Sequence, residues 1–235
     1  MRNWLCVTSP GLRNCPAGSA STLRLGPRPR PRAFLDAAKD DPLYPAFMLL
    51  LLYGLRRGEV LGLRWRDIDE DDGEIRIHQQ IQRVNGELRI GTLKTAAARR
   101  DLPLLKIAQE VLEIRRQVQA ADRAELGQAW QDTGLVFTTR TGRPIEPRNL
   151  VRSFRRICTA HELRPIKVHH LRHTTATLLK NLRLPARDAQ LILGHSRLAV
   201  TLEIYTHEDR QAQHDALGKV SAALGHDERH EDDQN

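Results

Sequence analysis

Residues 46–59, AFMLLLLYGLRRGE, join a strongly apolar run to two arginines and a glutamate. The run from Ala46 to Leu52 is too short to span a bilayer, which takes about 20 apolar residues, so we interpret it as a buried core helix. The segment Tyr53-Gly54-Leu55-Arg56-Arg57-Gly58-Glu59 closes this helix. Taken alone, Arg56 beside Arg57 is typical of cations near the carbonyls of a helix end. This stretch by itself therefore predicts a core helix and no particular function.

Helical periodicity extends from this core helix over most of the chain. Apolar residues recur at i, i+3 and i+4 spacing, as in the stripe Leu104, Ala108 and Val111. Pro185 lies in the first turn of another such segment and Gly194 ends it, which is the usual placement of these two residues. The spacing predicts helices at residues 34–39, 44–55, 58–63, 104–118, 150–158, 169–182, 185–193 and 216–224.

A period of two replaces the helical period between Ile75 and Pro103. Isoleucines alternate with polar residues from Ile75 to Ile81, and Asn85-Gly86 is a strong two-residue hairpin turn. The returning strand is expected at residues 88–90, a third strand at 100–103 and a further short one at 135–138. We therefore predict an α+β fold that is mainly helical, with a small three-stranded antiparallel sheet.

The composition favours a polyanionic partner. The 235 residues carry 37 Lys and Arg against 29 Asp and Glu, a formal net charge of +8, and the length fits one domain with a hydrophobic core. Nucleic acid is the commonest polyanion, although a merely basic soluble protein has the same composition. Cys6, Cys15 and Cys158 form no CxxC pair, which argues against a zinc knuckle or a disulfide framework and fits a reducing cytosol.

Both ends of the chain differ from its middle. Residues 1–31 are basic, rich in Pro and Arg and free of acidic residues, and their alternating prolines predict an extended arm or linker. Residues 225–235 are mostly acidic and are expected to form a disordered tail. No apolar run near the start is long enough for an export signal. The folded domain is therefore expected at residues 32–224.

Further local signatures follow the Arg56 segment in a fixed order. Lys94 lies in the turn before the predicted strand at 100–103. Residues 169–173 read His-His-Leu-Arg-His, residues 193–196 read Leu-Gly-His-Ser, and Tyr205 comes soon after. Any one of these signatures is weak evidence, whereas the ordered set is specific.

With these residues the chain resembles the tyrosine recombinase, or phage integrase, family across roughly residues 32–224. The family's pattern is an Arg in a "GLR…E" helix end, a Lys in a β-hairpin, His-x-x-Arg, Leu-Gly-His and then a Tyr. The resemblance implies the catalytic-domain fold of that family. It also implies a site-specific recombinase or integrase of a phage or integrative mobile element, which cleaves and rejoins DNA through a 3′-phosphotyrosyl intermediate. Tyr205 would be the nucleophile, Glu59 a structural partner, and the basic catalytic set Arg56, Lys94, His169, Arg172 and His195.

These residue types suit the cleavage of a phosphodiester. Arg56 and Arg172 offer paired donors to the non-bridging oxygens without losing their charge. His169 and Arg172 are three residues apart on a predicted helix, so both can face one phosphate. The phenol, with an ordinary pKa of about 10, must lose its proton. Either His169 accepts that proton, or Arg172 and His195 stabilise the phenolate, while Lys94 protonates the departing 5′ oxygen. Neither ATP, a metal nor another cofactor is expected.

Lys94 and His195 also have simpler interpretations. Lys94 is one of several cations, with Arg99 and Arg100 nearby, so a contact with a DNA phosphate explains it almost as well as proton transfer. His195 follows Gly194 and could simply cap the end of a helix. Both roles stay open on the sequence alone.

The histidines of the His-His-Leu-Arg-His segment allow a metal-binding alternative. His169 and His173 are four residues apart and could bind zinc on one helix face. A zinc site needs a third ligand, and Arg172 between the two histidines would repel a dication. We therefore favour the metal-free interpretation.

Tyrosine is the best discriminator among these residues. The chain contains Tyr44, Tyr53 and Tyr205, and the first two lie in or beside the apolar core helix. A structural role for Tyr205 is the alternative, but its place after the Leu-Gly-His element favours the nucleophile.

The resemblance sets expectations for partners and activity. A core-binding domain usually precedes the catalytic domain in this family, and residues 1–31 are too short and polar for it. An active recombinase, a truncated DNA-binding remnant without strand exchange, and a type IB topoisomerase-like enzyme therefore remain as alternatives. The expected partner is double-stranded DNA, bound by a homotetramer docked through the helix at residues 216–224. Neither a membrane nor a small-molecule substrate is expected, and the location would be the bacterial cytoplasm.

Overall fold

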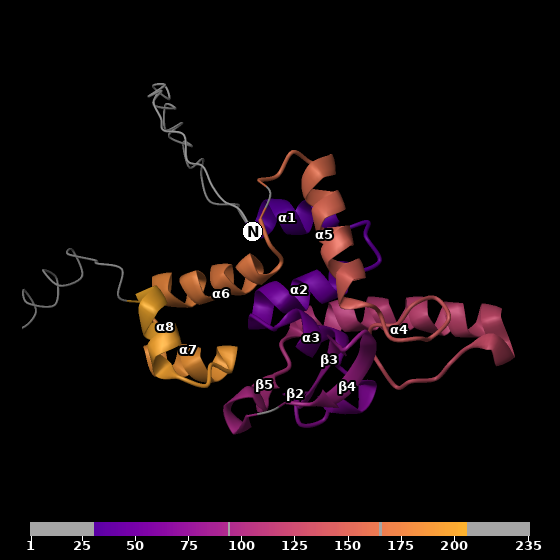
Figure 1. The fold of residues 1–235 in the computed structure, drawn as a ribbon, viewed down its shortest axis with the longest axis horizontal. Helices are drawn as coiled ribbons and strands as arrows, with labels where there is room; N and C mark the ends of the chain where they lie inside the picture. The colour runs from indigo at the N-terminus through magenta and orange to yellow at the C-terminus, as the bar shows by residue number, and fades with distance from the viewer. Residues whose placement is uncertain (1–30, 94, 165, 206–235) are drawn as a thin grey trace, which may run out of the picture.

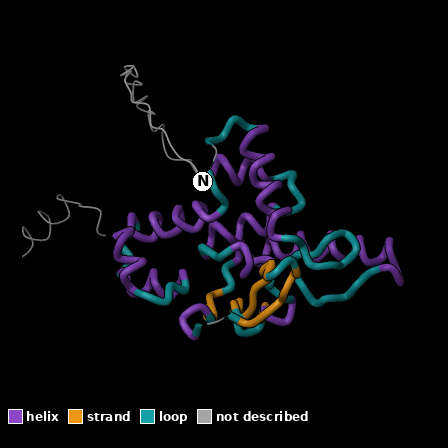
Figure 2. The backbone as a smooth tube through the Cα atoms, in the orientation of Figure 1, coloured by secondary structure: helices purple, strands orange, loops and turns teal. Residues whose placement is uncertain are grey.

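Helices make up most of the structure (Figures 1 and 2). The computed structural model describes residues 31–93, 95–164 and 166–205. The helices are α1 (Pro31–Ala38), α2 (Tyr44–Tyr53), α3 (Arg57–Leu61), α4 (Lys106–Leu126), α5 (Pro147–Ala160), α6 (His169–Asn181), α7 (Ala186–Leu193) and α8 (Leu198–Tyr205). The strands are β1 (Ile68–Asp69), β2 (Glu74–Ile77), β3 (Gln79–Val84), β4 (Glu87–Thr92) and β5 (Arg100–Pro103), and short 3-10 helices lie at Trp65–Asp67, Ala96–Ala98 and Gly127–Ala129. The mainly helical α+β fold predicted above is confirmed.

The central helix α2 is apolar on all its faces. Residues Pro45 to Leu51 are buried, because α1, α3, α4 and α6 pack around it. Phe47 also joins an aromatic cluster, in which its ring centroid lies 5.3 Å from that of Phe34 and 6.1 Å from that of Phe154. The buried core helix expected at residues 44–55 therefore organises the helical part of the fold (Figure 1).

The strands form two small antiparallel sheets. β1, β2 and β5 make a three-stranded sheet with β2 in the middle, whereas β3 and β4 pair only with each other. The ladder between β2 and β5 ends at Ile77 opposite Arg100, because the preceding residues Ala96–Ala98 form a 3-10 turn and offer no strand. The expected strand from Ile75 to Ile81 is thus divided at His78, and the predicted grouping of strands into one sheet is wrong.

The predicted hairpin turn is confirmed. Asn85 and Gly86 have φ angles of +50° and +82°, as a two-residue turn of type I′ requires. The turn joins β3 to β4, and Val84 pairs with Glu87 across it.

Several boundaries differ from the sequence-based expectation. α4 continues to Leu126 beyond its apolar stripe, since the following residues are good helix formers. α8 was not expected, and residues 135–138 form isolated bridges rather than a strand. The predicted arm up to residue 30, the helix at 216–224 and the acidic tail lie outside the described residues. Within the described part of the chain, no helix is long and apolar enough to cross a membrane.

Gly54 shapes the end of α2. Its φ of +60° lies in the left-handed region, which costs other residues conformational energy. A Cβ added at this position would lie 2.4 Å from Cδ2 of Leu193 on α7 and 3.4 Å from Cβ of Thr175 on α6. The glycine therefore allows α2, α6 and α7 to approach at the place where Arg56 follows.

We expect Gly54→Ala to destabilise the fold more than Gly73→Ala. Gly73 also has a positive φ, but its added Cβ would meet nothing within 4 Å. The Gly73 variant should lose about 1–2 kcal/mol from backbone strain, whereas the Gly54 variant should lose about 1–3 kcal/mol more from overpacking. Urea denaturation of both variants measures the difference. Equal losses would mean that contact with Leu193 is unimportant.

Candidate active site

The candidate site lies where α2 ends and α3, α6 and α7 meet. Arg56 immediately precedes α3, His169 and Arg172 lie in the first turn of α6, and His195 follows the end of α7. Partial loss of water around His169 and fuller burial of His195 lower the pKa of each ring, and the nearby charges of Arg172 and Arg56 lower it further. The structure thus brings these predicted residues into one electrostatic cluster.

Arg172 is a buried cation with spare hydrogen-bonding capacity. Only 4% of the residue is exposed, and its Nη1 donates to the carbonyl oxygen of Gly54 at 2.6 Å. Its Nη2 is buried and has no hydrogen-bond partner among the described residues. Burial and the charge of Arg56 lower the pKa of Arg172 to about 9, so the group stays charged at neutral pH. A buried charged nitrogen without a partner is costly, which makes it a donor for an incoming anion.

Glu59 is fully buried and is held by two arginines. It accepts hydrogen bonds from the backbone N of Arg56 at 3.0 Å, from Nη1 of Arg56 at 2.6 Å and from Nη2 of Arg100 at 3.0 Å. Burial raises the pKa of Glu59, but the charge of Arg100 and the bonds from Arg56 outweigh it and hold that pKa below its usual value. Glu59 is therefore a carboxylate, and the structural partnership expected for it is consistent with this geometry.

Arg100 is the residue of the cluster that sequence reasoning missed. Its Nε donates to the carbonyl of Ile192 at 2.7 Å and its Nη1 to that of Ala98 at 2.9 Å, in addition to the bond with Glu59. In the sequence, Arg100 stands out only as one of the cations near Lys94. The missed signal was the alternation of β5, which places Arg100 on the same buried face as Leu102.

His195 is neutral at physiological pH. Only 8% of it is exposed, and burial together with the charges of Arg172 and Arg56 lowers its pKa to about 4. Its Nδ1 lies 2.9 Å from Oγ1 of Thr201 on α8. Backbone groups close the end of α7, where the backbone N atoms of Gly194 and His195 both donate to the carbonyl oxygen of Gln190. The side chain of His195 contacts α8 instead.

His169 and His173 lie at the exposed edge of the cluster. Their rings meet edge to face with centroids 4.8 Å apart. Among residues 31–93, 95–164 and 166–205, no group of three or more His, Cys, Asp or Glu side chains is arranged to hold a metal ion.

Tyr205 is the last residue of α8. Its hydroxyl oxygen is buried without a hydrogen-bond partner in the described part of the chain. Burial and the charge of Asp188 raise its pKa. The structure therefore does not join the phenol to the basic cluster by a hydrogen bond.

Tyr53, in contrast, has a structural role. It donates its hydroxyl to the Pro103 carbonyl at 2.8 Å and accepts a hydrogen bond from the backbone N of Leu105. Lys94 lies outside the described residues.

A pocket of about 470 Å³ opens beside Arg56 and His169. Exposed cations line it, namely Arg57 at the start of α3, Arg155 on α5 and Lys167 before α6. The positive charge of the cluster therefore extends to the surface along these three side chains.

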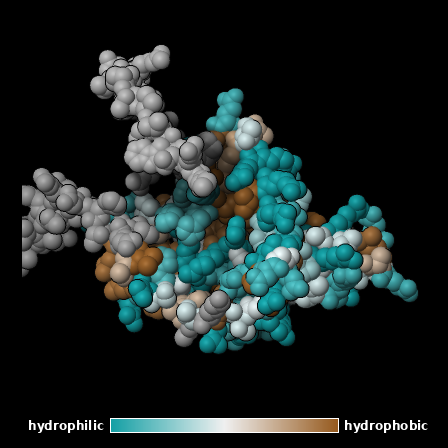
Figure 3. Space-filling model, viewed as in Figure 1, coloured by the Kyte–Doolittle hydropathy of each residue, from teal (hydrophilic) through white to brown (hydrophobic). Residues whose placement is uncertain are grey.

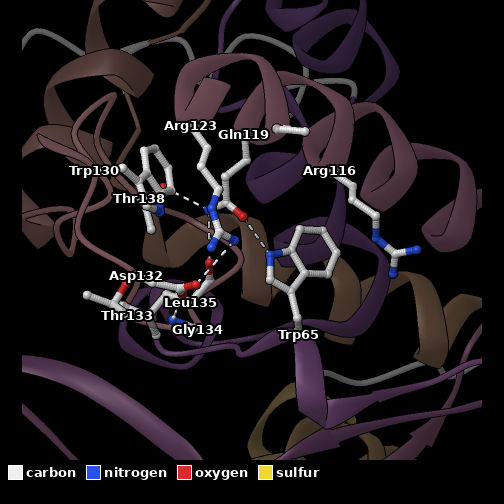
Figure 4. Close-up of a pocket in the computed structure, with 11 residues that line it drawn as sticks. Trp65, Arg116, Gln119, Arg123, Trp130, Asp132, Thr133, Gly134, Leu135 and Thr138 are labelled. Carbon is white, nitrogen blue, oxygen red and sulfur yellow. Dashed lines mark hydrogen bonds and ion pairs between the residues drawn. The ribbon is translucent and has the colours of Figure 1, made fainter. Parts of the chain in front are cut away.

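A separate pocket of about 410 Å³ lies along α4 (Figure 4). Trp65 donates to Gln119 at 2.6 Å, and the guanidinium of Arg116 lies 4.8 Å from the Trp65 ring. The arginines there are already paired, Arg116 with Glu70 at 2.8 Å and Arg123 with Asp132 at 3.3 Å. Their charge is compensated, unlike that of Arg172, so we do not assign this pocket to the site.

We expect Arg100→Met to destabilise the protein by about 3–5 kcal/mol, because it leaves Glu59 buried with one partner fewer. The control is Arg89→Met, which breaks the ion pair with Glu87, whose side chains are 60% and 71% exposed. The control should cost less than about 1 kcal/mol. Thermal and urea unfolding compare the two variants, and similar losses would contradict the role of the buried pair.

Comparison with known proteins identifies the family of the chain. A model of the Phage integrase family matches residues 32–212. The chain is 32% identical over 184 residues to a "Tyrosine recombinase XerC-like" protein of Caldanaerobacter subterraneus subsp. tengcongensis, covering 73% of this chain and 47% of that protein. It is 30% identical over 187 residues to an integrase of Streptomyces ambofaciens, covering 76% and 47%. The chain thus spans about half the length of the curated relatives it matches.

Solved structures share the fold. The Tn1549 transposon integrase in complex with transposon right end DNA is 23% identical, with a TM-score of 0.69 over 81% of this chain and 64% of that one. The XerA recombinase is 20% identical, with a TM-score of 0.60 over 85% and 64%. The family match, together with the cluster of Arg56, His169, Arg172 and His195, leads to one conclusion: the chain belongs to the phage integrase family of tyrosine recombinases.

Proposed function

We propose that this chain carries the catalytic domain of a site-specific DNA recombinase, which cleaves and rejoins strands through a 3′-phosphotyrosyl intermediate. The observation that carries the proposal is the buried Nη2 of Arg172, which has no hydrogen-bond partner in the part of the chain that the structure describes. Among the residues that the structure describes, the surrounding cluster holds the cations Arg56, Arg100 and Arg172 and one carboxylate, Glu59. A phosphodiester supplies both the missing negative charge and the missing acceptor oxygens.

The proposed cleavage step uses the phenol oxygen of Tyr205 as the nucleophile. This oxygen attacks phosphorus, the bond from phosphorus to the 5′ oxygen breaks, and the strand keeps a 3′-phosphotyrosyl ester. The phenol proton passes to a base, for which neutral His169 is the candidate, and Lys94 gives a proton to the departing 5′ oxygen. Arg56 and Arg172 stabilise the charge on the non-bridging oxygens. Attack by a 5′-hydroxyl reverses the step, so neither ATP nor a metal is consumed.

The pocket lined by Arg57, Arg155 and Lys167 is the proposed path for the DNA backbone next to the cleaved phosphate. These cations are exposed and lie beside Arg56 and His169, so phosphates that flank the scissile one can reach them. The Tn1549 integrase neighbours are complexes with DNA, which supports double-stranded DNA as the partner here.

We further propose that copies of the chain assemble on DNA as a tetramer through the segment at residues 216–224. Figure 3 shows apolar residues gathered over α7 and α8, and the exposed large side chains there include Leu191 at 59% and Val200 at 43%. Exposed apolar patches of this kind favour contact with another protein surface. A lambda integrase neighbour was solved as a dimer bound to a core site.

A bacterial, cytoplasmic and DNA-associated location is part of the same proposal.

We expect Tyr205→Phe to abolish the covalent adduct with DNA and to leave non-covalent binding within about a few-fold, because only the phenol oxygen is removed. The substrate is a nicked duplex from the genomic flanks of the gene, and the readout is a denaturation-resistant adduct on a gel. Tyr44→Phe is the matched control and should still form the adduct.

An adduct formed by the Tyr205→Phe variant would exclude Tyr205 as the nucleophile. If the wild-type protein binds DNA in a salt-dependent way without any adduct, it is a DNA-binding remnant. Site-independent supercoil relaxation would indicate a topoisomerase.

We expect Arg172→Lys to cleave DNA about 10²–10³-fold more slowly than the wild type, nearly as slowly as Arg172→Ala. Lysine keeps the charge but lacks the planar guanidinium that donates to two phosphate oxygens at once. Arg115→Lys is the control: Arg115 is equally buried, but donates to the carbonyls of Val136 and Thr138 away from the site. The control should lose stability and keep its cleavage rate when assayed below its unfolding temperature. Near wild-type cleavage by Arg172→Lys would show that charge alone matters.

A further inference from the structure

Thr201 contacts His195 from the helix that carries Tyr205. Thr201 is fully buried, with 0% of its surface exposed, and its Oγ1 lies 2.9 Å from Nδ1 of His195. Thr201 and Tyr205 are four residues apart in α8, so they share one face of that helix. The same face therefore holds a contact to His195 and the candidate nucleophile.

A neutral imidazole exists in two forms, which differ in the ring nitrogen that carries the hydrogen. One ring nitrogen carries the hydrogen and donates, while the other accepts, and the partner of one nitrogen decides the role of the other. His195 is in this neutral form, since burial and the charges of Arg172, Arg56 and Arg100 oppose its protonation and lower its pKa. A hydroxyl that donates to Nδ1 leaves the hydrogen on Nε2. His195 can then donate to an anion bound among the arginines.

We propose that Thr201 is a positioning residue: its hydroxyl donates to Nδ1 of His195, selects the Nε2–H form and joins the orientation of this ring to α8. The inference rests on the proposed function, because it gives the Nε2–H group a phosphate oxygen to bind. It adds a residue that acts through His195 and touches neither DNA nor the reacting atoms.

Thr175 provides a matched control for loss of a buried hydroxyl. It is 3% exposed, and its Oγ1 donates to the carbonyl oxygen of Leu51 at 2.7 Å. The carbonyl oxygen of Leu171 lies 3.1 Å from the same hydroxyl. Thr175→Val removes hydrogen bonds of similar burial without removing the contact to His195. A loss of stability common to both valine variants can thereby be separated from an effect on the ring.

The first measurement determines the form of His195 without DNA. Long-range proton–nitrogen NMR spectra of the full chain at pH 7 identify the protonated ring nitrogen, with the signal assigned from its loss in His195→Asn. We expect Nε2–H in the wild type and in Thr175→Val, and a mixture of both forms in Thr201→Val. An Nδ1–H form in the wild type overturns the proposal, even if Thr201→Val fails to fold. An unchanged form in a folded Thr201→Val overturns it as well.

The second measurement follows adduct formation on the nicked duplex at saturating protein, with DNA affinity measured separately. We expect Thr201→Val to slow adduct formation about 10- to 100-fold through misplacement of His195, with little change in affinity. Thr201→Ser, which keeps the hydroxyl, should restore most of the rate, and Thr175→Val should keep it. Equal rates for the two valine variants, or no rescue by serine, contradict the inference. If the wild type forms no adduct at all, the proposed function fails, whereas the NMR result still decides whether Thr201 sets the form of His195.

Discussion

The buried carboxylate of Glu59 is the contact on which the rest of the site depends. It accepts hydrogen bonds from Arg56 and Arg100, which belong to separate parts of the chain. Arg100 then binds the carbonyl of Ile192, and Arg56 binds that of Gly194 at 3.1 Å. One negative charge thus holds the end of α2, the start of β5 and the turn before His195 together. Because a buried carboxylate without partners is very costly, these pairings stabilise the folded chain.

The close packing around Arg100 also explains the glycine before His195. Gly194 has a φ of +66°, and a Cβ there would lie 2.6 Å from Nη1 of Arg100. The glycine therefore lets the chain turn at the end of α7 while the guanidinium passes beside it. The Leu-Gly-His signature is in this respect a packing requirement of the ion pair as well as a frame for His195.

The positive charge of the cluster is incompletely compensated. Arg115 is a buried arginine elsewhere in the fold, where backbone carbonyls of Val136 and Thr138 satisfy it. Arg172 is as deeply buried, but among the described residues it has one carbonyl partner, and its Nη2 has none. Burial of an arginine is therefore not what distinguishes the site; the missing acceptor is. Proteins tolerate such a cost where a ligand is to supply the missing contact.

The sequence by itself determined the features that depend on local spacing. An apolar run flanked by polar residues predicted α2, and the i, i+3 relation placed His169 and Arg172 on one helix face, since both follow from the geometry of a single helix. Only the tertiary structure decided which strands pair and which residues hydrogen-bond to the predicted site residues. A period of two shows which side chains share a face but not which strand lies beside it. Arg100 meets Glu59 across 41 residues and Ile192 across 92, and Thr201 meets His195 through the packing of α8. The alternation of β5 could indicate that Arg100 is buried, but its partners and the resulting pKa values arise from contacts between distant segments, which no local pattern of residues specifies.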